Sequence, residues 1–139
     1  MASIRKDIVV DVPVEDVWAA VRDVGAVHTR LARQMVVDTK LEGDSRLVTF
    51  ANGEVVRERI VTVDDKARRL VYAVAGWRTT HHNASFQVVP EKDGRSRLIW
   101  ITDLLPDTLA EMVGGLVEQG SAAIKQTLEE VQAGVKTRA

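Results

Sequence analysis

The three histidines of the chain are the side chains best suited to proton transfer near neutral pH. His81 and His82 are adjacent, whereas His28 lies far from them in the sequence. Because neighbouring side chains of a strand point to opposite faces, His81 and His82 cannot bind one metal ion together. A metal site would need His28 or Glu58 beside His82, so we expect no metal and take His82 as a candidate general base or ligand anchor. The alternative is one histidine in a hydrogen-bonded wall and the other at the surface.

Two charged side chains could assist proton transfer or bind a ligand. Glu58 shares the alternation of Val56 and Ile60, and if that face points inward, its carboxylate lies in an apolar setting where it could act as an acid or base. The alternative is a structural ion pair, because arginines flank Glu58 and a register shift of one residue would turn it outward. Arg30 could bind a ligand carboxylate or enolate through its guanidinium group, or it could be a solvated residue of a short helix.

The absence of other reactive motifs narrows the chemistry. The chain contains no cysteine, which excludes thiol catalysis, disulfides and cysteine metal sites. It also lacks a nucleophile motif, a phosphate loop and a cofactor fingerprint, since Gly114 and Gly115 lie inside a predicted helix rather than between a strand and a helix. We therefore expect no cofactor.

Length and composition indicate one globular domain over residues 1–139. Hydrophobic residues make up 45% of the chain and charged residues 28%, as in ordinary globular proteins. The formal net charge is -1 and basic residues are spread along the chain, which argues against a nucleic-acid partner. No segment approaches the ~20 apolar residues of a membrane span, and the first residues lack the apolar run of a signal peptide. We therefore expect a cytoplasmic protein without membrane insertion.

Hydrophobic periodicity and turn residues divide the chain into segments. A strand is expected over residues 4–12, followed by short helices over 14–22 and 26–33. The period-two pattern then predicts six strands, over 34–42, 46–50, 54–63, 70–75, 79–89 and 97–105. Beyond Pro106, apolar residues recur at helical spacing for about 25 residues. Tight turns between successive strands, such as Asn52-Gly53, indicate an antiparallel meander.

This order of elements predicts an α+β fold. Strands grouped apart from helices argue against a parallel α/β sheet. An antiparallel sheet of about seven strands with one apolar face must cover that face, and the long C-terminal helix is the only predicted element large enough. We therefore expect a curved sheet wrapped around that helix, with two short helices after the first strand.

Strand alternation predicts which side chains face a cavity between the sheet and the helix. The expected walls are apolar and aromatic, formed by Tyr72, Phe86, Leu98, Trp100, Val113, Leu116 and Val117. A few polar groups would orient a ligand there, namely His82, Glu58 and Thr102. Trp77 follows Gly76 in a loop and would form the cavity rim.

Glycines interrupt the helix that must cover the sheet, at Gly114, Gly115 and Gly120. Glycine costs about 1 kcal/mol in a helix interior. The three positions therefore suggest a close approach, a kink or room for a ligand. The alternative is a bent helix that simply follows a twisted sheet.

Four stretches of the chain, taken in order, resemble the SRPBCC superfamily: residues 12–18, 58–64, 69–72 and 96–106. This superfamily comprises helix-grip proteins, among them START lipid-transfer domains, the birch-pollen-allergen family and polyketide cyclases/dehydratases. Residues 27–31 and 80–85 resemble the polyketide cyclase/dehydratase-like branch. The resemblance implies a helix-grip fold with a small-molecule pocket, whose open end is capped by the short helices that carry His28 and Arg30. It leaves the ligand open, because a fold does not fix chemistry.

Three functions remain open. The first is binding of an apolar or aromatic small molecule, lipid- or polyketide-like, in the cavity. The second is a cyclase/dehydratase-type enzyme, with proton transfer by His82 and charge stabilisation by Glu58 or Arg30. The third is a protein-interaction module or homodimer without a ligand, which would use Ile99 and Ile101 on an outer face.

Overall fold

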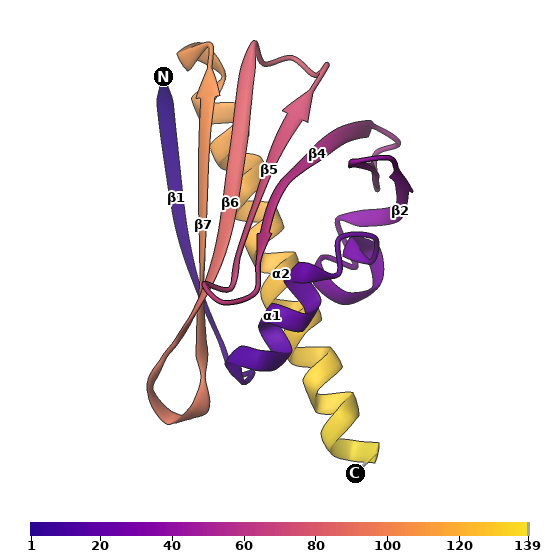
Figure 1. The fold of residues 1–139 in the computed structure, drawn as a ribbon, viewed down its shortest axis with the longest axis vertical. Helices are drawn as coiled ribbons and strands as arrows, with labels where there is room; N and C mark the ends of the chain where they lie inside the picture. Colours follow the sequence, from indigo (N-terminus) through magenta and orange to yellow (C-terminus); the bar gives the residue numbers. More distant parts are fainter. Residues whose placement is uncertain (139) are drawn as a thin grey trace.

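A computed structural model gives the fold, describing the backbone of residues 1–138 and the side chains of residues 1–135. One antiparallel sheet of seven strands dominates it, in the order β1-β7-β6-β5-β4-β3-β2 (Figure 1). The strands are β1 (Ala2–Val10), β2 (Val36–Glu42), β3 (Ser45–Phe50), β4 (Val55–Asp64), β5 (Arg69–Ala75), β6 (His81–Pro90) and β7 (Ser96–Leu105). The last six strands form the predicted meander. Strand β1 is the edge strand next to β7 and pairs with it from Ala2↔Leu104 to Val10↔Ser96.

The helices are α1 (Val14–Arg22) after β1 and the 29-residue α2 (Ala110–Arg138) at the end of the chain. Short turns supplement them: the π-helical η1 (Val27–Leu31) and the 3-10 turns η2 (Lys92–Gly94) and η3 (Asp107–Leu109). Helix α2 runs across one face of the sheet, and its C-terminal end extends past the strands (Figure 1). The α+β helix-grip prediction is therefore confirmed.

The second of the two expected short helices is reduced to the single π-helical turn η1. Its backbone leaves helical geometry at Ala32, where φ is -142° and ψ is 63°. The next residue, Arg33, donates its backbone N–H to the Thr127 hydroxyl on α2 at 3.0 Å. This bond fastens the turn to the long helix, which explains why the segment does not continue as a regular helix.

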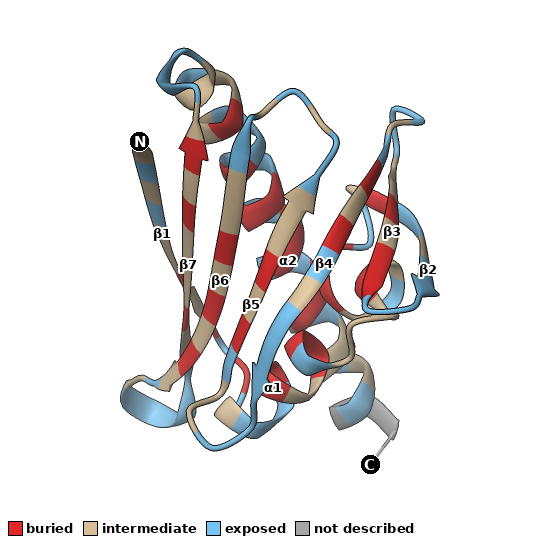
Figure 2. Ribbon diagram, turned by 45° about the horizontal axis from the view of Figure 1, so that its top comes forward, coloured by how far each residue is buried: buried red, intermediate tan, exposed pale blue. Residues whose placement is uncertain are grey.

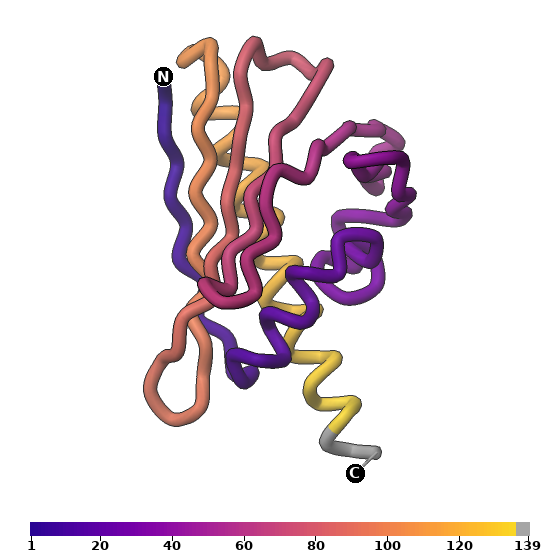
Figure 3. The backbone as a smooth tube through the Cα atoms, viewed as in Figure 1, coloured from indigo at the N-terminus to yellow at the C-terminus, as the bar shows by residue number. Residues whose placement is uncertain are grey.

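Curvature of the sheet comes mainly from β4, which bends away from the flat β1-β7-β6 part (Figure 3). The register of β4 with β5 shifts between Ile60 and Thr62, the signature of a β-bulge. A bulge bends its strand and increases the local twist. The β2-β3-β4 part therefore curls around, and a space opens between it and α2.

Burial alternates along the strands as the sequence predicts, with buried residues separated by intermediate or exposed ones in Figure 2. In β6, Ala84, Phe86 and Val88 are buried, and in β7 Leu98 and Leu104 are inaccessible to solvent. These side chains form the inner face against α2 and α1. Among the described residues, no helix is both long and apolar enough to cross a membrane.

Helix α1 is tied to the sheet by one carboxylate at the turn between β4 and β5. Asp65 accepts a hydrogen bond from the Trp18 indole N–H at 3.0 Å and another from Arg22 Nε at 2.7 Å. The Trp18 ring itself is buried with Val17 and Val21 in the main core. The buried face of α1 thus covers the end of the sheet opposite the β5–β6 loop.

Candidate functional site

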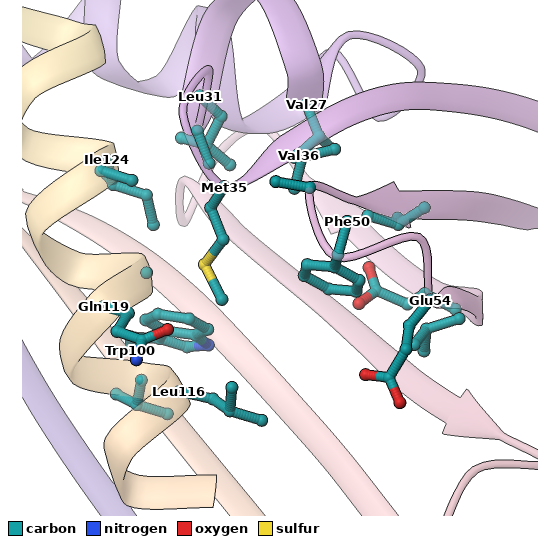
Figure 4. A pocket seen from close by; sticks show the side chains of 18 of the residues that line it. Val27, Leu31, Met35, Val36, Phe50, Glu54, Trp100, Leu116, Gln119 and Ile124 are labelled. Carbon is teal, nitrogen blue, oxygen red and sulfur yellow. The ribbon is translucent and has the colours of Figure 1, made fainter.

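A cavity of about 570 Å³ lies between the inner face of the sheet and α2. Side chains from η1, from strands β2 to β7 and from α2 line it, and most of them are apolar (Figure 4). Met35 precedes β2 and extends toward Trp100, while the Phe50 ring lies across the cavity from α2 (Figure 4). The volume falls within the roughly 300–1,000 Å³ typical of small-molecule sites.

An aromatic row forms the sheet side of the cavity. Tyr72, Phe86 and Trp100 lie on the neighbouring strands β5, β6 and β7. The Tyr72 and Phe86 ring centroids are 6.1 Å apart at 28°, and those of Phe86 and Trp100 are 4.8 Å apart at 26°. Such a row presents a broad apolar surface against which a flat molecule can stack.

The close approach of α2 to this row depends on Gly120. A β-carbon at Gly120 would lie 3.0 Å from two ring carbons of Trp100 and 3.4 Å from Met35 Sδ. At Gly115 nothing lies within 4 Å of such a carbon, and at Gly114 only Ile4 comes to 4.0 Å. Of the alternatives for these glycines, close approach therefore holds for Gly120.

A buried ion pair interrupts the apolar wall. Arg46 Nε donates to Glu58 Oε1 at 2.8 Å, and the two side chains are only 3% and 11% exposed. The Arg46 guanidinium carbon also lies 5.1 Å from the Tyr72 ring centroid, within cation–π distance. Because loss of either partner would leave an uncompensated buried charge, the pair has a structural role whatever else it does.

Burial raises the pKa of the Tyr72 hydroxyl above its usual value, and the negative charge of Glu58 adds to that shift. Tyr72 therefore stays protonated at physiological pH and can donate or accept a hydrogen bond. The Trp100 indole N–H is also buried, near the Tyr72 hydroxyl, but makes no hydrogen bond of ordinary geometry.

The end of the cavity near the β5–β6 loop carries two more nitrogen atoms without partners. Trp77 Nε1 and His82 Nδ1 are buried and make no hydrogen bond within the described part of the chain. Their rings lie together, with centroids 6.3 Å apart and a 48° tilt. Burial lowers the pKa of His82, and the neighbouring His81 adds to the shift, so the imidazole is neutral at physiological pH.

Arg78 connects three elements around this end of the cavity. Its guanidinium contacts Glu54 at 3.3 Å and Met112 Sδ at 3.4 Å, and its carbon lies 5.5 Å from the Trp77 ring centroid. Glu54 belongs to the β3–β4 hairpin and Met112 to α2. The β5–β6 loop that carries Arg78 is thereby held against both walls at the rim.

Most of the residues proposed from the sequence line this cavity: Tyr72, Phe86, Trp77, His82, Trp100, Glu58 and Leu116. Glu58 faces inward and is paired at the same time, with Arg46 rather than with the flanking arginines. Arg57 instead pairs with Glu42 at 2.7 Å and Arg59 with Asp44 at 3.3 Å, both near the surface. The role of these residues in ligand binding stays a prediction.

Four proposed residues lie away from the cavity lining, and one of them, Leu98, is fully buried in the main core. Thr102 is 2% exposed in the packed region where β1, β7 and α2 meet, beside Ile4. The ring of His28 contacts the Thr39 hydroxyl at 3.0 Å on the outer side of η1. Arg30 pairs with Asp23 at 3.0 Å near the surface, while Val27 and Leu31 form the buried side of η1.

Several cavity residues were missed by the sequence analysis, and some had a usable signal. Arg46 alternates with Val48 and Phe50 in β3, so the same rule that placed Phe86 inside would have placed all three inside. The Asn52-Gly53 turn also brings Arg46 opposite Glu58. Met35 gave no usable signal, because alternation within the expected strand over 34–42 would direct it to the face opposite Val36, whereas β2 begins at Val36 and both side chains line the cavity.

Ile99 and Ile101, considered for a protein interface, are half-buried on the outer face of β7, an interior strand of the sheet. More exposed apolar side chains lie elsewhere, among them Val37 and Leu41 on β2 and Val55 and Val61 on β4. Within residues 1–135, no group of three or more histidine, aspartate or glutamate side chains is placed to hold a metal ion.

Comparison with known proteins places this architecture in a family. Residues 1–129 match the family described as "Polyketide cyclase / dehydrase and lipid transport". The chain belongs to this family. The match covers nearly the whole chain and confirms the resemblance to the SRPBCC superfamily noted in the sequence. None of the curated proteins matches the chain.

Solved structures support the same fold. A protein from Thermobifida fusca is 30% identical, with a TM-score of 0.77 over 94% of this chain and 92% of that one. The di-domain ARO/CYC protein BexL, from the BE-7585A biosynthetic pathway, is 18% identical, with a TM-score of 0.82 over 95% of this chain and 48% of that chain. Norcoclaurine synthase from Thalictrum flavum, in complex with dopamine and hydroxybenzaldehyde, is 19% identical, with a TM-score of 0.70 over 93% of this chain and 87% of that one.

Proposed function

We propose that the protein binds a small, mostly apolar molecule with a flat ring system in the cavity between the sheet and α2. The observation that carries the proposal is the 570 Å³ cavity itself, with its largely apolar lining. A filled core of this size would not retain such a space, because protein interiors are close-packed and large voids are costly. The row of Tyr72, Phe86 and Trp100 favours a planar ligand over a branched one.

Family membership agrees with this proposal without naming the ligand. The family description combines cyclase, dehydrase and lipid-transport members, all of which would use such a cavity. Among structures of the same fold, norcoclaurine synthase was solved with dopamine and hydroxybenzaldehyde, both aromatic molecules. At 19% identity this likeness concerns the fold, so the ligand must be found by experiment.

The test is direct binding of 2-ethylnaphthalene, measured by calorimetry, to the wild-type protein and to Ala123→Phe. Ala123 is buried on α2 and lines the cavity, so the larger ring would occupy the ligand space. Ala133→Phe, at an exposed position of the same helix, is the matched control. We expect binding in the wild type and in the control, and a loss of at least about tenfold in Ala123→Phe. Circular dichroism establishes that the variants fold, and equal binding by all three proteins would reject the cavity as the site.

A second candidate function, proton transfer in a cyclase- or dehydratase-type reaction, is favoured by one observation. The neutral His82 imidazole lines the cavity, and its Nδ1 has no partner within the described residues, so it is available as a base. The test is deuterium uptake from D₂O into the methyl group of 2-acetylnaphthalene, followed by NMR. Exchange that the wild type accelerates and His82→Gln does not would support catalysis. Exchange at the uncatalysed rate with the wild type would reject catalysis and leave ligand binding as the proposed function.

A further inference from the structure

We propose that Trp77 and His82 form a subsite for an uncharged hydrogen-bond acceptor on the ligand, such as a ketone or aldehyde oxygen. The inference rests on the proposed function and adds to it the polar group of the ligand and its place in the cavity. Two observations carry it: the paired rings at one end of an apolar cavity, and the buried nitrogen on each of them that lacks a partner.

Buried polar atoms without hydrogen bonds are rare in folded proteins, because each costs about 1–3 kcal/mol relative to a satisfied one. Two such atoms on contacting rings, both lining one cavity, need a common explanation. An indole N–H can only donate, and a neutral imidazole has one nitrogen that donates. An oxygen acceptor of a ligand placed between Trp77 and His82 would satisfy the indole and could accept from the imidazole in one tautomer.

The charge of the acceptor follows from the surrounding groups. The cation that the described residues bring to this end is Arg78, which is exposed and already engaged with Glu54 and Met112. The other charged groups of the lining, Arg46 and Glu58, neutralise each other. Glu58 lies two strands from His82, on the order of 10 Å away by strand spacing. A carboxylate at the Trp77 end would therefore be buried without a counter-ion, which is costly, whereas a carbonyl oxygen would not.

The experiment compares two probes of similar shape. 2-Acetylnaphthalene carries a carbonyl oxygen, and 2-ethylnaphthalene lacks it. The measured quantity is the ratio of their dissociation constants in the wild type, in Trp77→Phe and in His82→Phe. Trp18→Phe is the matched control, because the Trp18 N–H is bonded to Asp65 outside the cavity. Phenylalanine keeps an aromatic ring at each position and removes the indole N–H of Trp77 or the two ring nitrogens of His82.

We expect the preference for the ketone to fall about fivefold in Trp77→Phe or in His82→Phe, with the hydrocarbon bound as in the wild type. The control should leave the ratio unchanged, and 2-naphthoate should bind the wild type more weakly than the ketone. An unchanged ratio in both cavity variants, equal weakening of both probes, or tighter binding of the naphthoate would overturn the subsite while leaving cavity binding intact. Failure of both neutral probes to bind the wild type would instead reject the proposed function, and the subsite with it.

Discussion

Replacing Gly120 with alanine would place a methyl group against the indole ring of Trp100. The β-carbon would lie 3.0 Å from two ring carbons, whereas carbon atoms in ordinary contact are about 3.5–4.0 Å apart. The ring would have to move by about half an ångström, although Phe86 stacks on it at 4.8 Å. Overpacking of this kind costs about 1–3 kcal/mol, which cancels or exceeds the gain of about 1 kcal/mol that alanine brings to a helix interior.

Gly115 on the same helix provides the matched control. It is exposed, and no atom lies within 4 Å of the β-carbon that alanine would add. Gly115→Ala should therefore stabilise the protein by about 1 kcal/mol. The free energy of unfolding should then be lower in Gly120→Ala than in Gly115→Ala by about 1–3 kcal/mol.

Urea unfolding followed by circular dichroism measures this difference, provided that the m-value stays the same in both variants. A thermal scan should show the same order, with about 4 °C for each kcal/mol in a domain of this size. Equal stabilisation by the two alanines would refute the reasoning, because it would mean that α2 and the Trp100 ring can separate without cost.

Further predictions concern the charged groups and the rim. Glu58→Gln should destabilise the protein by about 3–5 kcal/mol in urea unfolding, because it leaves Arg46 charged and buried, whereas Glu42→Gln, in an exposed pair, should cost less than about 1 kcal/mol. Since the pKa of His82 is lower in the folded protein than in the unfolded chain, the unfolded chain binds the proton more readily. Stability should therefore fall as pH decreases below about 6.5, and His82→Phe should reduce that fall; an unchanged pH profile would contradict the assignment. Arg78→Ala should raise the dissociation rate of 2-acetylnaphthalene up to about fivefold in stopped-flow measurements, and an unchanged rate would show that the rim contacts do not limit release.

The strand faces could be predicted from the sequence because alternation has a period of two and one face must be apolar. Phe86, Trp100 and Tyr72 were placed inside on that basis, and the structure has them in one row. The same rule, combined with the register of the β3–β4 hairpin, would also have predicted that Arg46 lies opposite Glu58. Regular elements therefore carried most of the information on the cavity wall.

The rest depended on geometry that periodicity does not encode. His28 and Arg30 lie outside the cavity lining because Val27 and Leu31 occupy the buried face of η1. Gly115 and Gly120 look alike in the sequence, and only the rotation of α2 against the sheet distinguishes them. Trp77 lies in the β5–β6 loop, where no periodic pattern predicts which way its side chain and unpaired nitrogen point.

Helix α2 forms one wall of the cavity and is synthesised after every strand of the sheet. Strands β1 to β7 leave the ribosome before it, with the aromatic row of β5, β6 and β7 still uncovered. At roughly 5–20 residues per second, the 29 residues of α2 take about 1.5–6 s to add. Until α2 has emerged and packed, the sheet exposes the surface that later faces the cavity, so it is open to chaperones and to aggregation. A chain that ends before residue 110 lacks α2 and cannot cover its own core.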